Sequence, residues 1–286
     1  MKEPMKAATK IPTDDEIPMP CLVSGKLDGV GAVVYGAELL SRNLIDIPNK
    51  HTYNALSYTA LEGLHGELTL RNDMHNFNKN MSAFTTIEGK PDFIFNVFDD
   101  FSSPNMPAEA RKAQCKTRVE QLAMLGYPVV FCQQHKCSTI QEVHEYYAEY
   151  RSKGYEGLII SLPSGLYKFG RSTLKQALSL KLKPCADAEA EVVGYEEMFY
   201  NLDAGNSIRK DNLVPSNMLG ALVCKLKNGV TFNVGSGFTE IQRIDLWQNK
   251  EQLIGKLITF KFMHYFPATG IPRHPVFKGF RSKVDA

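Results

Sequence analysis

Residues 222–234 read LVCKLKNGVTFNV, and this stretch decides the fold of the second half of the chain. Apolar residues recur at every second position before Asn228-Gly229, and the same period resumes after it. A period of two is typical of a half-buried strand, and Asn-Gly between two such runs is a strong hairpin signal. The stretch therefore predicts a β-hairpin, with one face formed by Leu222, Cys224, Leu226, Val230, Phe232 and Val234.

The sequence around the hairpin predicts a small barrel. Thr239, with Gln242 three residues later, forms a capping box for a helix through about Lys250. The period of two returns at Ile258, Phe260 and Phe262. About a hundred residues of mostly β-structure with one helix indicate an OB-type barrel over residues 186–286.

The first part of the chain, residues 1–185, predicts a separate α+β domain. Helices are expected at Ala108–Leu125, closed by Gly126, and at Ile140–Lys153, started by Ser138 with Gln141. Strands are expected at Phe93–Phe98, Leu158–Leu162 and Leu178–Lys183. Because strands and helices do not alternate regularly, antiparallel sheets with added helices are favoured over a doubly wound parallel fold.

The composition of the chain limits its partners and its compartment. The 33 Lys and Arg barely outnumber the 31 Asp and Glu, so a nucleic-acid surface requires local clustering. One such cluster, or else a solvated charged tail, is formed by Arg273, His274, Lys278, Arg281 and Lys283. Six scattered cysteines favour a reducing cytosol. Cys132, His135 and Cys137 admit a metal site, but no second pair follows at zinc-finger spacing.

The first twenty residues mix charged residues with proline and contain no apolar segment. They are therefore expected to be neither a signal peptide nor a membrane span. A soluble, cytoplasmic protein is predicted.

Lys26-Leu27-Asp28-Gly29 follows the apolar run Cys21–Val23, which predicts a strand end. A lysine attacks phosphorus only as the free amine, so its pKa has to be lowered by burial or by neighbouring cations. The alternative is a surface turn, because four residues in this pattern are common by chance.

Lys181 and Lys183 lie on one face of the predicted strand 178–183, and three leucines lie on the other. Two neighbouring ammonium groups repel each other, so a phosphate is a natural partner, and they could also depress the pKa of Lys26. An amphipathic strand with a solvated lysine face is the alternative.

Three further residues could complete a nucleotide site. Glu67 and Glu156 are lone acids beside glycines at strand starts, where each could bind Mg²⁺, accept a hydrogen bond from a ribose hydroxyl, or be an exposed turn acid. Phe98 ends an apolar run and is either a core residue or a stacking surface for a base.

In order and spacing, these segments resemble the covalent nucleotidyltransferases, and most closely the small viral and phage ATP-dependent DNA ligases. The resemblance covers nearly the whole chain after residue 20. It rests on 26–29 (KLDG), 41–43 (SRN), 66–68 (GEL), Phe98, 156–157 (EG), 181–183 (KLK), 194–197 (GYEE), 218–222 (MLGAL) and 273–281 (RHPVFKGFR).

The resemblance implies that Lys26 attacks ATP to form a lysyl-adenylate, that AMP passes to the 5′-phosphate at a nick, and that the 3′-hydroxyl then displaces AMP. Mg²⁺ or Mn²⁺ would assist, held by Glu156 and Glu67. The other implied roles are ribose binding by Glu67, base stacking by Phe98, phosphate contacts by Lys181 and Lys183, and action near the 3′-hydroxyl by Asp28. Arg42 and Arg171 would contact DNA phosphates, and Arg281 would orient pyrophosphate.

The sequence departs from the pattern at two positions. Gly31 stands where many relatives have arginine, and Ser24, counted here with the nucleotide-binding residues, stands where they often have glutamate. Arg71 or Lys79 could compensate for the missing arginine. The polar stretch from Phe199 to Asn217, with Arg209 and Lys210, is hypothesised to contact or clamp the duplex.

The predicted partner is nicked duplex DNA, bound by a monomer, in the host cytoplasm if the protein is viral. An mRNA capping guanylyltransferase or an RNA ligase would share the Lys26 motif, although the 273–281 segment counts against RNA ligases that lack the second domain. An NAD-dependent ligase is expected to be longer and to carry a four-cysteine zinc site. A non-catalytic nucleic-acid-binding protein would leave Lys26 without a role.

Overall fold

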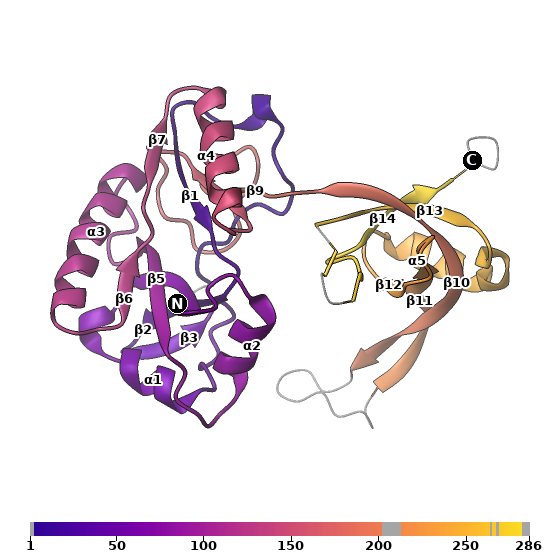
Figure 1. Cartoon of the computed structure of the whole chain (residues 1–286), viewed down its shortest axis with the longest axis horizontal. Helices are drawn as coiled ribbons and strands as arrows, with labels where there is room; N and C mark the ends of the chain where they lie inside the picture. Colours follow the sequence, from indigo (N-terminus) through magenta and orange to yellow (C-terminus); the bar gives the residue numbers. More distant parts are fainter. Residues whose placement is uncertain (1–2, 202–212, 264, 267–268, 282–286) are drawn as a thin grey trace. The chain divides into compact units, whose positions relative to one another are not determined.

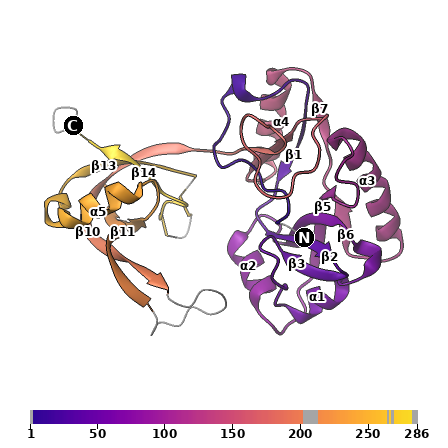
Figure 2. The ribbon, with the colours of Figure 1, turned by 180° about the vertical axis from the view of Figure 1, so that it is seen from behind.

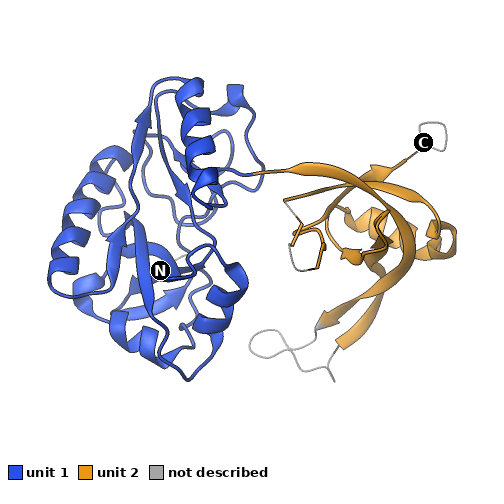
Figure 3. Ribbon diagram, viewed as in Figure 1, with its two compact units in different colours: residues 1–183 blue, residues 184–286 orange. Residues whose placement is uncertain are grey.

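The computed structural model describes residues 3–201, 213–263, 265–266 and 269–281. The chain forms two compact units, residues 1–183 and 184–286 (Figure 3). The predicted division into functional domains at residues 185 and 186 stays a prediction.

One sheet of the first unit has the strand order β7-β1-β8-β9, with all neighbours antiparallel. Its strands are β1 (Cys21–Lys26), β7 (His135–Cys137), β8 (Gly157–Ser161) and β9 (Leu180–Leu182). The predicted strands at 21–23 and 158–162 are confirmed. The predicted strand 178–183 is shorter, because only its three central residues pair with β8.

The other sheet of the first unit has the order β3-β2-β4-β5-β6. Figure 1 labels β2, β3, β5 and β6 of this sheet. Its strands are β2 (Val30–Tyr35), β3 (Glu38–Ser41), β4 (Leu64–Leu70), β5 (Phe93–Asp100) and β6 (Val129–Phe131). All pairs are antiparallel except β5 and β6, which run parallel because a helix connects them. The sheet is thus antiparallel with one parallel edge.

Four α-helices cover these sheets: α1 (Lys50–Leu56), α2 (Phe77–Thr85), α3 (Ala108–Met124) and α4 (Ile140–Ser152). Short 3-10 turns lie at Asp14–Glu16 and Thr59–Leu61. The predictions of α3 and α4 are confirmed, and α4 begins at Ile140 as expected, but its N-cap is Thr139 rather than Ser138. Its capping box is made by Thr139 and Glu142, not by Ser138 and Gln141.

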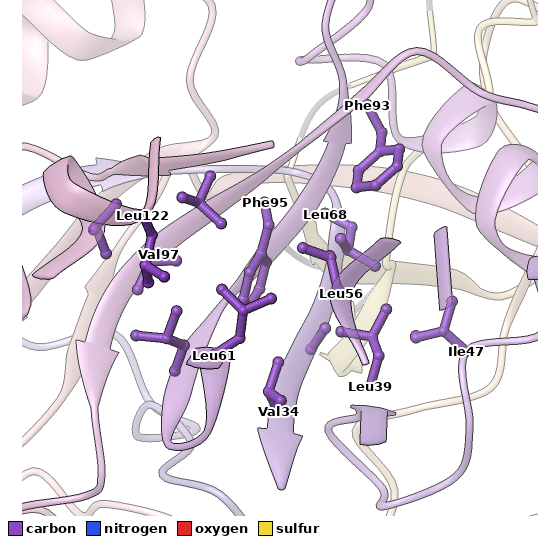
Figure 4. Packing of buried hydrophobic residues seen from close by; sticks show 14 of the residues in the cluster. Val34, Leu39, Ile47, Leu56, Leu61, Leu68, Phe93, Phe95, Val97 and Leu122 are labelled. Carbon is purple, nitrogen blue, oxygen red and sulfur yellow. The ribbon is translucent and has the colours of Figure 1, made fainter. Parts of the chain in front are cut away.

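One hydrophobic core of the first unit lies on one face of the larger sheet, and a second packs α4 against the smaller sheet. Leu68 and Phe95 of the larger sheet's core are completely buried (Figure 4). Leu64 is buried in the same cluster, and Cys115 and Val119 of α3 belong to it as well. The view from behind shows α3 alongside β5 and β6 (Figure 2). Burying each large apolar side chain contributes roughly 1.5–3 kcal/mol, so this layer fixes the opposite face of β4 as a surface for polar residues.

The second unit is a five-stranded barrel with the order β12-β11-β10-β13-β14. Its strands are β10 (Ala186–Asn201), β11 (Leu213–Lys225), β12 (Thr231–Val234), β13 (Leu257–Phe262) and β14 (Val276–Phe280). A bridge between Ser236 and Val276 joins the end of β12 to β14 and closes the barrel. The predicted OB-type architecture is confirmed.

The hairpin predicted from residues 222–234 is confirmed, with Leu222 opposite Val234 and Lys225 opposite Thr231. Gly229 takes the positive φ of 88° that its turn requires. Helix α5 (Glu240–Gln248) has the predicted capping box of Thr239 and Gln242, and a 3-10 turn at Lys250–Leu253 follows. The helix ends slightly before the expected Lys250.

The long loop expected from Phe199 to Asn217 is partly strand. Phe199, Tyr200 and Asn201 pair with Pro215, Val214 and Leu213 as an extension of the ribbon of β10 and β11. Arg209 and Lys210 lie outside the described residues.

Candidate active site

Strand pairing in the smaller sheet gathers the predicted lysines around Glu156. Lys26, the last residue of β1, is opposite Gly157 of β8, and the Glu156 backbone N–H donates to the Lys26 carbonyl at 2.9 Å. On the other side of β8, Ile159 is opposite Lys181 of β9. The pairing therefore brings Lys26, Glu156 and the paired lysines to one edge of the sheet.

Glu156 accepts hydrogen bonds from two lysines. Its Oε2 contacts the Lys26 ammonium, and its Oε1 accepts from Lys183 Nζ at 3.2 Å. The Glu156 side chain is only 7% exposed, so both ion pairs are shielded from water. Burial favours the protonated carboxyl, but the two lysines outweigh burial and lower the pKa of Glu156.

The expected depression of the Lys26 pKa is wrong for this structure. Burial does oppose the charged form of Lys26, but Glu67 and Glu156 outweigh burial and raise its pKa above the ordinary value. The sequence shows the cations near Lys26 but not the two carboxylates that the fold brings closer. Lys26 is therefore an ammonium at neutral pH and must lose a proton before it can attack.

Lys181, in contrast, has a lowered pKa. Burial contributes most, followed by the positive charges of Lys183, Lys26 and Arg171. Arg171 is exposed and donates to the Ala7 carbonyl at 2.9 Å. The mutual repulsion predicted for the paired lysines is therefore present, and Arg171 adds to it.

Gly29 joins the lysine turn to the larger sheet. Its backbone N–H donates to Glu67 Oε1 at 2.8 Å. The buried side chain of Asn80, on α2, donates to the backbone carbonyl of Asp28 at 3.2 Å and accepts from the Leu70 N–H at 2.8 Å. These bonds fix the turn after Lys26 against β4, so Asn80 is a positioning residue for the site.

Replacing Gly29 with alanine is expected to destabilise the protein by about 3 kcal/mol, the upper end of typical overpacking costs. A Cβ at this position would lie 2.2 Å from the Leu68 carbonyl oxygen, which belongs to a rigid strand. Gly31→Ala is the matched control, because a Cβ there would come no closer than 3.8 Å to another residue. Urea unfolding of both variants measures the difference; equal stabilities would contradict the predicted fit.

A pocket of about 110 Å³ lies between the two sheets of the first unit. The smaller sheet contributes Ser24, Lys26, Ile159 and Ser161, and the larger sheet contributes His65, Glu67, Phe98 and Asp99. Met5, Ala7, Gly25, Leu27, Lys112 and Ser179 complete the lining. The pocket has both an aromatic ring and a lysine in its wall, an arrangement that suits a base attached to a phosphate chain.

Phe98 is half-buried in the wall of this pocket rather than in the apolar core. Its ring centroid is 4.5 Å from that of His65, at an interplanar angle of 59°. Phe98 is therefore not an ordinary core residue, and its stacking on a base stays a prediction.

Arg42 lies beside Gly31, the position at which the expected arginine is missing. The Arg42 backbone N–H donates to the Gly31 carbonyl at 3.2 Å, and its exposed side chain passes over the glycine. The other proposed substitutes, Arg71 and Lys79, are exposed and form ion pairs with Asp92 and Asp73.

The basic cluster of the C-terminal segment is not uniformly free to bind phosphate. Lys278 pairs with Asp187 and Arg281 with Glu189, each at 2.5 Å, while Arg273 is only 6% exposed. The acids come from β10, far away in sequence, so the linear run could not reveal them. Lys283 lies outside the described residues.

The histidine of the suggested metal group, His135, contacts two tyrosines. His135 stacks on Tyr146 at 4.3 Å and shares a hydrogen bond with the Tyr150 hydroxyl at 3.2 Å. Within the described ranges, no group of three or more His, Cys, Asp or Glu residues is placed to hold a metal ion. Nor does that part of the chain contain a helix with the length and apolar character of a membrane span.

Sequence reasoning missed several residues of the site, among them Asn80, His65, Ile159 and Lys112. The period of two in β4 was a signal for His65, because it puts His65 on the same face as Glu67. Asn80 and Lys112 lie on helices whose approach to the site depends on tertiary packing, and no local pattern reveals it.

Comparison with known proteins identifies DNA ligases that share this architecture. Residues 214–281 match the model of the DNA ligase OB-like domain. The structure aligns with the Chlorella virus DNA ligase-adenylate at 31% identity, covering 99% of each chain with a TM-score of 0.58. A Lig E DNA ligase shares the fold at 23% identity, with 96% of this chain and 98% of that chain covered and a TM-score of 0.70.

The chain is also 29% identical over 202 residues to the DNA ligase of African swine fever virus, strain Badajoz 1971 Vero-adapted. That match covers 67% of this chain and 44% of the viral protein, so the chain spans less than half the length of the curated relatives it matches. With 31% identity and 99% coverage of the Chlorella virus structure, the chain belongs to the DNA ligase family. The resemblance predicted from the motifs is thereby confirmed.

Proposed function

We propose that this chain seals nicks in duplex DNA through a lysyl-AMP intermediate on Lys26. The observation that carries the proposal is a half-buried lysine in the wall of a pocket whose opposite wall contains Phe98 and Glu67. Such a pocket suits a nucleotide, with its base against the ring and its α-phosphate at the lysine. The Chlorella virus structure, which is named a ligase-adenylate, supports this assignment.

The chemistry has three steps. The Lys26 amine attacks the α-phosphorus of ATP, so that a phosphorus–nitrogen bond forms and pyrophosphate leaves. An oxygen of the 5′-phosphate at the nick then takes AMP from Lys26. Finally the 3′-hydroxyl attacks the 5′-phosphate, the phosphodiester bond forms, and AMP leaves.

Side chains from both units have complementary roles in this proposal. Lys181 and Lys183 stabilise the negative charge that develops on the α-phosphate, Glu67 binds the ribose, and Phe98 stacks on adenine. Asp28 acts near the 3′-hydroxyl, Arg42 and Arg171 contact DNA phosphates, and Arg281 orients pyrophosphate. Ser24, buried in the pocket wall, borders the base.

Glu156 and Glu67 flank Lys26, and two carboxylates with substrate phosphates are a common donor set for Mg²⁺. Bound there, Mg²⁺ or Mn²⁺ would neutralise charge on the phosphates. Occupation of Glu156 would also draw its carboxylate away from Lys26.

Sealing of a nicked duplex with ATP and Mg²⁺ tests the proposed function. The expected product is a continuous strand that appears with ATP and not with GTP or NAD. A protein adduct formed only from GTP would replace the ligase assignment with a guanylyltransferase. Activity of the monomer, and its predicted cytoplasmic location, are part of the same proposal.

The rate of AMP transfer to Lys26 is expected to rise with pH. The pKa of Lys26 is raised, so below that pKa the reactive amine increases about tenfold for each pH unit. Glu156→Gln removes one of the two carboxylates responsible and should move the rising limb to lower pH. Single-turnover adenylation rates across the pH range give the pH at which the rate rises separately from the maximal rate. A limb that stays in place or moves to higher pH would contradict the role of Glu156.

The ribbon of β10 and β11 is proposed to contact the duplex. It exposes Phe199, Tyr200 and Val214, an apolar surface unusual for a protruding ribbon. Deleting residues 208–214 should weaken binding to nicked DNA while AMP transfer to Lys26 continues. Fluorescence anisotropy with a labelled nick measures affinity; unchanged affinity would rule the contact out.

A further inference from the structure

His65 is a buried histidine with one ring nitrogen tied to the protein. It is 6% exposed and lies on β4, two residues before Glu67 on the same face. Its Nδ1 is 2.9 Å from the hydroxyl oxygen of Tyr167.

The surroundings of Tyr167 decide which ring nitrogen of His65 carries the hydrogen. The Tyr167 oxygen already accepts the Met5 backbone N–H at 3.1 Å. Among the described residues, His65 is the one acceptor within hydrogen-bond distance of the tyrosine O–H. The hydroxyl therefore donates to Nδ1, and a neutral imidazole with an accepting Nδ1 has its hydrogen on Nε2.

The Nε2–H group faces the pocket. Among the described residues, none is a hydrogen-bond partner of Nε2. Every fully buried side-chain nitrogen or oxygen in the described residues does have a partner, so Nε2 is not one of the fully buried atoms. Nε2 therefore retains contact with open space, and the space that His65 borders is the nucleotide pocket. Because the His65 ring lies against Phe98, this donor is beside the surface on which the base would stack.

We propose that His65 is a specificity-determining residue whose Nε2–H donates to a ring nitrogen of the bound purine, with Tyr167 as the positioning residue that holds this tautomer. This inference rests on the proposed adenylation of Lys26. A neutral donor fixed by a buried tyrosine recognises the in-plane lone pair of N1, N3 or N7. It also supplies a polar contact in a pocket where the expected glutamate is replaced by Ser24.

A series of ATP analogues tests the proposal on the full chain. The second-order rate of AMP-adduct formation is measured with ATP and with its 1-deaza, 3-deaza and 7-deaza forms, each of which replaces one ring nitrogen by C–H. One analogue is expected to react about tenfold more slowly, as for the loss of one hydrogen bond. In His65→Phe, ATP itself should slow by about tenfold, and that analogue should no longer differ from ATP.

Two variants separate recognition from a structural role. His65→Gln retains an N–H donor and should restore part of the discrimination between ATP and the deaza analogue. Tyr167→Phe removes the hydroxyl that holds the hydrogen of His65 on Nε2, and this variant should reduce the same discrimination. His144→Gln, an exposed histidine on α4, is the matched control.

Three outcomes would overturn the inference. First, all three analogues could react as fast as ATP with the unmodified chain. Second, one analogue could still react more slowly than ATP in His65→Phe. Third, Lys112→Met could abolish the difference between that analogue and ATP while His65→Phe does not. The analogue series on the unmodified chain decides the matter even if His65→Phe does not fold. Failure to form any adduct with ATP would instead contradict the proposed function.

Discussion

Replacing Lys26 with alanine is expected to abolish both the AMP adduct and the sealing of an ordinary nick. No other group in the described pocket combines an amine with a position beside Glu67 and Glu156. Lys26→Arg should fail as well, because a guanidinium is not deprotonated in proteins. Losing a covalent nucleophile costs roughly a millionfold in rate in enzymes where it has been measured, so adduct formation should fall below detection.

The later chemistry offers a control for the Lys26 variants. A nick whose 5′-phosphate already carries AMP needs only the last step, so Lys26→Ala should still seal it. Lys153→Ala, which removes an exposed lysine on the surface, should behave like the unmodified chain with both substrates. Sealing of an ordinary nick by Lys26→Ala would contradict the assignment of the nucleophile.

Asp99→Ala is expected to cause the largest loss of stability, about 3–5 kcal/mol. Asp99 and Arg111 are each 1% exposed, and Arg111 donates to both carboxylate oxygens, at 2.7 and 3.1 Å. Removing the carboxylate would leave the guanidinium buried beside the Tyr167 ring without a counter-charge. The midpoint temperature of thermal unfolding should fall by roughly ten degrees for a unit of this size.

The matched control for Asp99 is Asp92→Ala, which removes the exposed partner of Arg71. Exposed ion pairs contribute about 1 kcal/mol or less, so this variant should melt close to the unmodified protein. A double variant, Asp99→Leu with Arg111→Leu, should recover part of the stability, since it removes both charges together. If Asp99→Ala and Asp92→Ala cost the same, the buried pair would not have the importance that its geometry indicates.

Much of the fold follows from local patterns in the sequence. The hairpin around Asn228-Gly229, the capping box at Thr239 and the long helix α3 each carry their own turn or capping signal, and all three are present. The short helices α1 and α2 were missed, although Asn49 and Asn76 cap them. A helix of two turns has too few residues to show a clear period, so a single capping asparagine is its main signal.

The sequence predicts which residues form the active site, but it does not predict how their charges shift the pKa of Lys26. The order of Lys26, Glu67, Phe98 and Glu156 in the sequence predicts a shared pocket, yet the direction of the Lys26 pKa shift depends on which charges lie closest. Strand pairing puts Glu156 directly against Lys26, whereas the paired lysines are on the next strand. The same limitation applies to Arg281, whose partner Glu189 lies 92 residues away.

The tautomer of His65 is a property of the site that the sequence alone does not determine. Its place on the face of Glu67 is visible in the alternation of β4, but its tautomer depends on Tyr167 and Met5, which are distant in the chain. Contacts that connect such distant segments form only in the folded protein. Structure is therefore needed to convert a list of polar residues into donors and acceptors.

The most direct measurement of the central claim is peptide mapping by mass spectrometry after incubation of the full chain with ATP and Mg²⁺. We predict a mass increase of one AMP on the peptide that contains Lys26, lost again when nicked DNA is added and the strand becomes continuous. An AMP adduct on a different residue, or an adduct on Lys26 that persists with a nicked duplex and yields no sealed strand, would contradict the proposed function.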